Sequence, residues 1–185
     1  DLLYILAFAN PNRTGAWSGV VGTKMSNLGL EDGIKKLGYK FIRADVGDKY
    51  VSNMLTKKGW MLGGETSGHI ICKDLVSTGD GTIAALKVIS SLLMLEKKPS
   101  EVLANYTKIP QINIAVPVKN KDIVNDKDLQ SLIKEIESDM TIGRVLIRAS
   151  GTEPKIRIMI EAPQTDVAKK FARDIESLIL KKSKI

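Results

Sequence analysis

The segment GRVLIRASGTEPKIRIMIE, residues 143–161, decides the fold of the second half of the chain. Both of its flanks alternate apolar and polar residues with a period of two, which is the period of a half-buried β-strand. Val145 and Ile147 share a face on the first flank, and three isoleucines share one on the second. The SGTEP between the flanks consists largely of turn-forming residues. We therefore predict a hairpin in which Arg148 closes the first strand and Arg157 opens the second.

The tip of this hairpin gathers groups that bind anions. Guanidinium forks match phosphate oxygens bidentately, and a loop with hydroxyls and a glycine offers closely spaced donors that a ligand can approach. The pattern predicts a phosphate site made of Arg148, Ser150, Gly151, Thr152 and Arg157. The residues alone leave open a solvated hairpin whose arginines pair with nearby glutamates, Glu153 and Glu161.

A second motif, GGETSGH at residues 63–69, follows a predicted strand. Ligands of open α/β sheets bind at the carboxyl ends of the strands. Glu65 is a natural acceptor for a pair of sugar hydroxyls, Ser67 can add a hydrogen bond, and His69 could assist proton transfer or contact a phosphate. The alternative is a turn whose histidine is merely a neighbour of the core.

Two weaker motifs have simpler explanations. VGDKY at 46–50 has turn chemistry, and Asp48 suits a helix cap better than a catalyst. STGDG at 77–81 is rich in glycine, but a capping role for Asp80 in the helix that follows accounts for it. No cluster of His, Cys, Asp and Glu has the spacing of metal ligands.

Strands and helices alternate in the first half of the chain, which favours a parallel sheet built from βαβ units. We expect helices at 1–10, 26–38, 50–59 and 80–98, and strands at 20–25, 39–46 and 60–65. In the helix at 80–98 the apolar spacing predicts a buried stripe of Ile83, Leu86, Ile89, Leu92 and Leu93. Because such a domain should begin with a strand, we expect its first strand to be missing and the chain to be a fragment.

The second half has a different order of elements. Strand 111–118, helix 126–140, strands 144–150 and 155–162, and helix 165–180 give a βαββα pattern, typical of a small α+β layer. The predicted fold class is therefore a parallel-sheet α/β domain at 1–108 followed by an α+β domain at 109–185.

Composition limits the classes of function. The chain is 43% hydrophobic and 26% charged, as in ordinary globular proteins, and it has no apolar run long enough for a membrane span. A single cysteine, Cys72, in an apolar run indicates a buried inert thiol and a reducing compartment, so we expect a cytoplasmic protein. The net charge of +7 favours anionic partners, but aromatic residues are only 5% and no basic block is interleaved with them, which argues against nucleic acid.

Taken together and in order, GGETSGH, VGDKY, STGDG and RASGTEPKIRIM resemble the C-terminal half of the α-D-phosphohexomutase family, and most of all its bacterial branch that acts on glucosamine phosphates. The resemblance covers essentially the whole chain. It implies a four-domain enzyme whose first domain carries a phosphoserine and whose second binds Mg²⁺ on a DGDGDR-type loop. The chain has neither motif, so it would start inside the third domain, and alone it should be inactive.

The resemblance also implies roles for this chain. Glu65 and Ser67 would bind sugar hydroxyls with His69 nearby as an assistant, and the hairpin residues named above would bind the non-reacting phosphate. The intact enzyme would interconvert glucosamine 6-phosphate and glucosamine 1-phosphate through the phosphoserine and a bisphosphorylated sugar, for UDP-N-acetylglucosamine and peptidoglycan synthesis. Thr66, where relatives often have Asn, Gln or Met, does not settle substrate preference.

Cofactors and partners follow from the same resemblance. Mg²⁺ would be held by the missing part, and glucose or glucosamine 1,6-bisphosphate would act as activator or intermediate. The expected partner is a phosphosugar, with no nucleic acid and no membrane, and with a homodimer open for the intact enzyme. The alternatives are a phosphomannomutase/phosphoglucomutase relative, a non-catalytic phosphosugar-binding module, and a nucleic-acid-binding protein.

Overall fold

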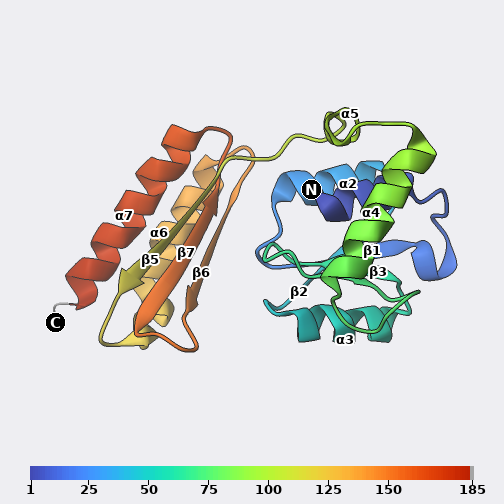
Figure 1. Ribbon diagram of the computed structural model, residues 1–185. Helices are drawn as coiled ribbons and strands as arrows, with labels where there is room; N and C mark the ends of the chain where they lie inside the picture. The colour runs from blue at the N-terminus through green and yellow to red at the C-terminus, as the bar shows by residue number, and fades with distance from the viewer. Residues whose placement is uncertain (184–185) are drawn as a thin grey trace. The chain divides into compact units, whose positions relative to one another are not determined.

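A computed structural model describes residues 1–183, which form two compact units. The first unit is Asp1–Lys108 and the second begins at Ile109. Figure 1 labels their helices and strands, and each unit is described by itself. None of the helices in residues 1–183 is long and apolar enough to cross a membrane.

The first unit contains a four-stranded sheet in the order β2-β1-β3-β4. Its strands are β1 (Gly19–Thr23), β2 (Lys40–Ala44), β3 (Leu62–Gly64) and β4 (Ile70–Cys72). The pairs β1–β2 and β1–β3 are parallel, which confirms the α/β fold, whereas β4 runs antiparallel to β3. The sheet is therefore mixed rather than wholly parallel. The connection Glu65–His69 is too short for a parallel crossover, so it returns the chain as a hairpin.

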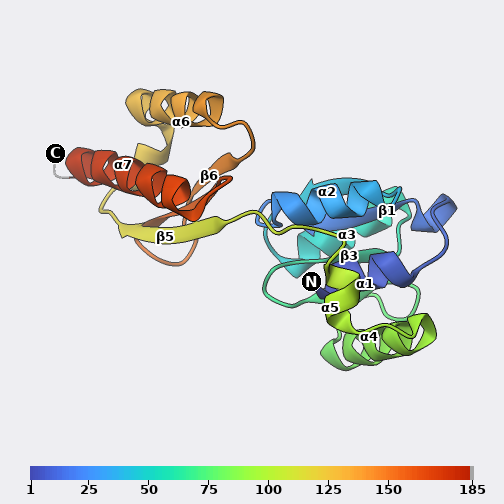
Figure 2. The same ribbon diagram turned by 90° about the horizontal axis from the view of Figure 1, so that it is seen from above.

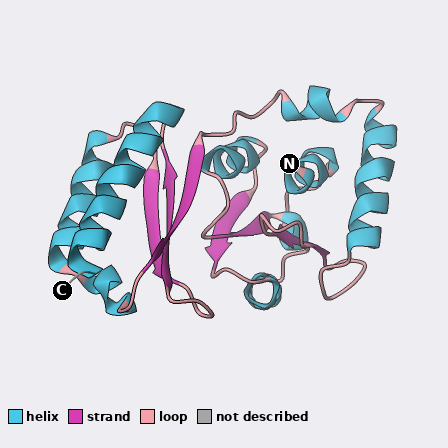
Figure 3. Cartoon of the chain, turned by 60° about the vertical axis from the view of Figure 1, so that its left-hand side comes forward, coloured by secondary structure: helices cyan, strands magenta, loops and turns pink. Residues whose placement is uncertain are grey.

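Helices cover both faces of this sheet (Figures 1 and 3). They are α1 (Leu2–Ala9), α2 (Leu28–Lys36), α3 (Asp48–Lys58), α4 (Gly81–Leu95) and α5 (Pro99–Leu103), with a short 3₁₀ turn η1 (Gly15–Trp17). Val20 of β1 belongs to the core beneath α1 and α4, while its neighbour Val21 belongs to the core beneath α3. Because successive side chains of the strand point to opposite faces of the sheet, β1 contributes residues to two separate cores. Cys72 is 1% exposed, and burial raises the pKa of its thiol, as an inert cysteine requires.

Caps and glycines fix the helix ends. The side chain of Asn27 accepts a hydrogen bond from the N–H of Gly29 at the start of α2, and Asp80 accepts one of 2.9 Å from the N–H of Ile83 at the start of α4. Gly38, just past α2, has φ +90°, a conformation that favours glycine. The predicted capping role of Asp80 is confirmed.

The buried face of α4 agrees with the predicted stripe only in part: Ile83 and Leu92 are partly buried, and Leu92 packs against the core. Leu86, Ile89 and Leu93 are 62%, 55% and 72% exposed, whereas Ala84 and Val88 are buried. Apart from Lys87, the helix sequence GTIAALKVISSLLML has no charged residue. Because the apolar residues encircle the helix, periodicity did not identify the buried face, and contacts with α1 and β4 decide it.

The second unit is a three-stranded antiparallel sheet in the order β5-β7-β6, with two helices on one face (Figures 1 and 2). Its elements are β5 (Gln111–Pro117), η2 (Lys121–Asn125), α6 (Lys127–Asp139), β6 (Arg144–Ala149), β7 (Lys155–Glu161) and α7 (Thr165–Ser183). The predicted βαββα order is confirmed. The isoleucines of β7 at 156, 158 and 160 pack against α6 and α7, and the residues between them face the other way.

Two charged contacts support this unit. Glu161 is fully buried at the end of β7, and its Oε2 lies 2.7 Å from Nε of Arg144. Asp126 caps α6, and Lys182 near the end of α7 contacts both Asp126 and Asp128, at 2.8 and 2.5 Å. The second contact ties the start of α6 to the end of α7.

We predict that Val88→Ala and Leu86→Ala differ in stability. Val88→Ala removes two buried methyl groups and should cost about 2 kcal/mol, whereas Leu86→Ala should stay within about 0.5 kcal/mol. The two tryptophans, Trp17 and Trp60, both lie in the first unit, so their fluorescence during urea unfolding reports on it. Equal losses for the two variants would contradict the described orientation of α4.

The second unit should lose stability in acid partly through Asp126. The hydrogen bond from Lys182, aided by its charge and by the backbone N–H groups of α6, lowers the pKa of Asp126 below its ordinary value. Because the folded-state pKa is the lower one, the stabilisation is complete above pH about 4 and is lost as the pH falls through the depressed pKa.

The variant Asp126→Asn keeps a capping oxygen but removes the charge. We predict that wild type exceeds Asp126→Asn in stability at pH 7 and that the gap closes towards pH 3, measured by amide hydrogen exchange in α6 and α7. Asp139→Asn, an exposed change on the same helix, serves as the control. A gap that does not depend on pH would show that the charge of Asp126 contributes nothing.

Candidate functional site

The connection Glu65–His69 between β3 and β4 is a tight turn at the carboxyl end of a central strand. The N–H of Glu65 donates to the carbonyl of His69 at 3.0 Å, and the N–H of Gly68 donates to the carbonyl of Glu65 at 3.1 Å. Gly68 has φ +95°, which explains the glycine at this position. The turn brings the side chains of Glu65, Ser67 and His69 together.

These three side chains form one hydrogen-bonded group. The hydroxyl of Ser67 lies 2.7 Å from Oε1 of Glu65 and 2.9 Å from Nδ1 of His69. Nδ1 of His69 is also 3.4 Å from Oε1 of Glu65. The Glu65 side chain is 11% exposed and that of His69 is 55% exposed. The group therefore has a fixed, partly buried carboxylate and an accessible imidazole.

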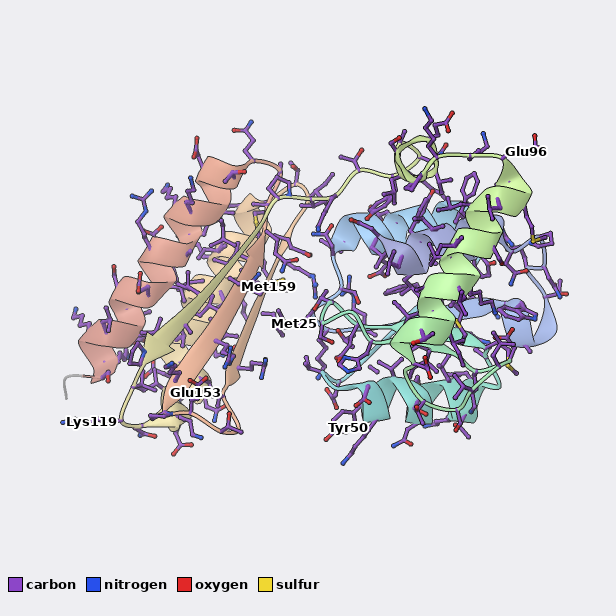
Figure 4. The ribbon with its side chains drawn as sticks, viewed as in Figure 1. Met25, Tyr50, Glu96, Lys119, Glu153 and Met159 are labelled. Carbon is purple, nitrogen blue, oxygen red and sulfur yellow. The ribbon has the colours of Figure 1, made fainter. Side chains whose placement is uncertain are left out.

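The backbone of Gly47 holds the other oxygen of this carboxylate. Its N–H donates to Oε2 of Glu65 at 3.1 Å and so joins the loop after β2 to the loop after β3. Gly47 has φ 129° and ψ 136°, and a Cβ there would lie 3.2 Å from Cδ2 of Tyr50, which Figure 4 labels at the start of α3. The sequence did not predict this contact, although a glycine directly after the predicted strand 39–46 was a usable signal.

Asp48 is not the N-cap of α3, because Gly47 occupies that position and no side-chain cap is formed. Asp48 lies in the first turn instead, where its Oδ1 accepts a hydrogen bond from the N–H of Lys49 at 2.7 Å. A carboxylate in the first turn still complements the helix dipole. Asp48 thus has a structural role, as expected, but in the first turn of α3 and not at its N-cap.

A hollow of about 260 Å³ opens beside the Glu65 turn within the first unit. Glu65, Thr66 and Gly68 line one side of it, and Ser26 and Leu30 line another. The hollow lies at the carboxyl ends of β1 and β3, where ligands of open α/β sheets bind. Asp1 and Lys108 also line it, so that the hollow combines carboxylates, an ammonium group, hydroxyls and apolar surface, which suits a small polar ligand.

The hairpin tip of the second unit has a defined register. Arg148 of β6 lies directly opposite Arg157 of β7, and the N–H of Ser150 donates to the carbonyl of Lys155 at 2.9 Å to close the turn. Because Val145 and Ile147 face the helices, both arginines lie on the opposite face of the sheet. Like charges directly opposite each other on neighbouring strands are destabilising unless an anion lies between them.

Within the described residues 1–183, only one of these two arginines forms an ion pair with a carboxylate. Glu153, labelled in Figure 4 in the turn between β6 and β7, lies 2.5 Å from Nη2 of Arg157 and 2.8 Å from Nζ of Lys155. The hydrogen bond and charge of Lys155, together with Arg157, hold the pKa of Glu153 below its ordinary value. Glu161 pairs with Arg144. Among residues 1–183, no carboxylate forms an ion pair with Arg148.

The remaining members of the hairpin cluster differ in exposure. Ser150 is buried, whereas Gly151 and Thr152 are exposed, and a Cβ added at Gly151 would meet no atom within 4 Å. The ammonium of Lys121 donates to the carbonyl of Ser150 at 2.9 Å and adds a positive charge to the tip. No sequence signal pointed to Lys121, because it lies in a polar segment far from the hairpin along the chain.

The described part of the chain, residues 1–183, contains no group of three or more His, Cys, Asp and Glu side chains that could hold a metal ion. The two candidate groups lie in different units, one around Glu65 and one around Arg148. Each is described by itself as a candidate site, with a carboxylate and an imidazole in the first unit and guanidinium groups in the second.

Comparison with known proteins gives matches for both units. Residues 1–109 match the family described as phosphoglucomutase/phosphomannomutase, alpha/beta/alpha domain III, and residues 112–178 match phosphoglucomutase/phosphomannomutase, C-terminal domain. The phosphoglucosamine mutase of Polynucleobacter asymbioticus is 46% identical over 97% of this chain and 40% of that protein. That of Cellvibrio japonicus is 43% identical over 97% of this chain and 41% of that protein. The chain thus spans about 40% of the length of the curated relatives it matches.

Solved structures agree in fold. The N-acetylphosphoglucosamine mutase of Aspergillus fumigatus, in complex with GlcNAc-6P and magnesium, has a TM-score of 0.80 at 21% identity, over 95% of this chain and 45% of that one. A serine-to-alanine variant of the same enzyme with glucose 1,6-bisphosphate has a TM-score of 0.82 at 22% identity, over 98% of this chain and 43% of that one. At these identities the similarity shows the fold alone.

We predict that Gly47→Ala destabilises the first unit and frees the Glu65 carboxylate. The backbone conformation of Gly47 is nearly inaccessible to other residues, so the change should cost roughly 1–3 kcal/mol. Gly81→Ala is a matched control, because Gly81 has open space around it and lies at the start of α4. Urea unfolding followed by tryptophan fluorescence measures both. A Gly47→Ala variant as stable as Gly81→Ala would contradict the strained geometry.

Proposed function

The chain belongs to the phosphoglucomutase/phosphomannomutase family of α-D-phosphohexomutases, and from this premise we propose that it is the C-terminal part of a bacterial phosphoglucosamine mutase. The intact enzyme interconverts glucosamine 6-phosphate and glucosamine 1-phosphate, through a phosphoserine and a bisphosphorylated sugar. Support comes from relatives named phosphoglucosamine mutase that are 39–46% identical to the chain. The reaction supplies glucosamine 1-phosphate for UDP-N-acetylglucosamine and peptidoglycan synthesis, and its place is the cytoplasm.

We assign the sugar hydroxyls to the first unit. Glu65 and Ser67 bind a pair of hydroxyls, and His69 lies beside them to assist proton transfer. The assignment rests on the fixed carboxylate, which the N–H of Gly47 holds at 3.1 Å, and on the neighbouring hollow. A carboxylate that is already oriented loses little freedom when the sugar binds, which favours affinity.

We assign the non-reacting phosphate to the second unit, with Arg148, Ser150, Gly151, Thr152 and Arg157 as its ligands. The observation that carries the proposed function is the cross-strand register of Arg148 with Arg157. Two opposed guanidinium groups, of which only that of Arg157 has a carboxylate partner among residues 1–183, form a site with unbalanced positive charge. A phosphate placed between them turns this repulsion into two charge-assisted contacts.

The phosphate ligands of the second unit together form what we call the phosphate clamp. The reaction sequence explains why a clamp of this kind is useful. A bisphosphorylated intermediate has to turn round before it returns its second phosphoryl group, so the clamp has to accept a phosphate on either end of the sugar. Guanidinium and hydroxyl donors bind the phosphate group itself and not a particular ring position. Phosphoryl transfer relies mainly on positioning and electrostatic stabilisation, and this chain supplies positioning.

Magnesium does not fit the described part of this chain, since residues 1–183 offer no suitable cluster of ligands. The proposal therefore assigns Mg²⁺ and the phosphoserine to the rest of a longer protein, with glucose or glucosamine 1,6-bisphosphate as activator or intermediate. The phosphosugar is the principal partner, and a homodimer belongs to the intact enzyme. The chain alone is expected to have no mutase activity.

We predict that Arg148→Ala, in a full-length mutase that carries this chain as its C-terminal part, lowers kcat/KM for glucosamine 6-phosphate about 10- to 150-fold. This corresponds to the loss of one charge-assisted contact of about 1.5–3 kcal/mol. Steady-state assays of the wild-type enzyme and the variant provide the measurement, with mannose 6-phosphate as the comparison substrate.

Arg173→Ala is the matched control, because it removes the same charge from an exposed position on α7. It should leave kcat/KM unchanged. An equal effect of the two variants would mean that only net charge matters, and an unaffected Arg148→Ala enzyme would remove Arg148 from the clamp. Faster turnover of mannose 6-phosphate than of glucosamine 6-phosphate would favour the phosphomannomutase alternative.

A further inference from the structure

We propose that Glu65 and Ser67 hold neutral His69 in the tautomer with its proton on Nδ1, so that Nε2 presents a lone pair to the ligand. The inference rests on the proposed function only for the identity of that ligand, a phosphosugar. Glu65 and Ser67 thereby act as positioning residues for His69, in addition to their own contacts with the sugar.

The direction of the hydrogen bonds is set at Gly47. A backbone N–H can only donate, and that of Gly47 donates to Oε2 of Glu65 at 3.1 Å. As a carboxylate, Glu65 can only accept, so its other oxygen, Oε1, has to face a donor as well. The donor next to it is the hydroxyl of Ser67, at 2.7 Å.

Ser67 transmits this direction to the imidazole. A serine hydroxyl has one hydrogen and two lone pairs. Because that hydrogen is directed to Glu65, the contact of 2.9 Å between Ser67 and Nδ1 of His69 requires Nδ1 to be the donor. The separation of 3.4 Å between Nδ1 and Oε1 of Glu65 agrees, since a protonated Nδ1 is attracted to the carboxylate. In the neutral ring, the lone pair is then on Nε2.

This assignment restricts the ligand group that neutral His69 can contact. The imidazole is 55% exposed, and an unprotonated Nε2 accepts a hydrogen bond but donates none. The group opposite it must therefore carry a hydrogen, as a sugar hydroxyl or the ammonium of an amino sugar does. A phosphate oxygen becomes a partner only after the ring is protonated. Neutral His69 is thus arranged to receive a proton from the sugar.

The test uses the 185-residue chain without any ligand. His69 is the only histidine in the chain, so histidine labelled with ¹⁵N gives one pair of ring nitrogen signals. Their couplings to the ring carbon protons distinguish the tautomers above the pH at which the ring titrates. We expect wild type to show a protonated Nδ1 and an unprotonated Nε2, opposite to the preference of a free histidine side chain. A protonated Nε2 in wild type would overturn the proposal.

Two variants test the mechanism. In Glu65→Gln, the N–H of Gly47 still needs an oxygen, so the amide NH₂ has to face Ser67. The hydroxyl of Ser67 then accepts from the amide and donates to Nδ1, which should exchange the two nitrogen signals. Ser67→Ala, a change at an exposed position, removes the contact at 2.9 Å but leaves the Glu65 carboxylate 3.4 Å from Nδ1, so the tautomer ratio should move part of the way towards the free preference. Glu153→Gln, in the other unit, is the control and should leave the tautomer as in wild type.

An unchanged tautomer ratio in Glu65→Gln, or in Ser67→Ala where Glu65→Gln unfolds, would overturn the proposal even if wild type had the expected tautomer. Backbone amide spectra check that each variant keeps its fold, and the exposed position of Ser67 keeps the test valid if Glu65→Gln unfolds. Since no substrate is present, failure here leaves the phosphate clamp untouched. The kinetic effect of Arg148→Ala, in turn, carries no information about His69.

Discussion

Both units depend on the two-residue period of the β-strand. In β1 this period sends Val20 and Val21 to separate cores, and in β7 it sends Ile158 to the helices while Arg157 faces the other way. Since α6 and α7 cover only one face of the second sheet, the same period leaves Arg148 and Arg157 together on the opposite face. A slip of one residue would bury the arginines and expose the isoleucines. The burial of the isoleucines thus fixes the position of the candidate phosphate ligands.

The ion pair between Glu153 and Arg157 does not remove Arg157 from such a site. Exposed ion pairs contribute little, because water screens them, whereas charge-assisted hydrogen bonds to phosphate are among the strong ones. In the proposed phosphate site, a phosphate would therefore displace the Glu153 carboxylate from Arg157 at a net gain. Until it does, Glu153 keeps the guanidinium near the turn, and it balances Lys155 at the same time. Of the pairing that the alternative explanation expected, the structure shows the one between Arg157 and Glu153, whereas Glu161 pairs with Arg144.

The sequence predicted what local signals determine, and it failed where contacts distant in the chain decide. The alternation of apolar and polar residues was sufficient to predict which side chains of β6 and β7 face the helices. Asp80 was sufficient to predict where α4 begins. The buried face of α4 was not predictable, because nearly every position is uncharged and the contacts with α1 and β4 select Val88 over Leu86. The antiparallel direction of β4 depends on the hydrogen bonds of the turn before it. The contact of Gly47 with Glu65 joins two loops that a helix separates in sequence.

That contact has a consequence for the chemistry of the first unit. A side-chain donor in place of Gly47 would rotate with its rotamer, and a hydroxyl could reverse its role from donor to acceptor. A backbone N–H can do neither. Gly47 adopts a conformation nearly closed to other residues, and its N–H points at Glu65 as long as β2 and α3, the elements on either side of it, are folded. The backbone therefore sets the direction of the hydrogen bonds from Glu65 through Ser67 to His69, and with it which nitrogen of the imidazole accepts a proton.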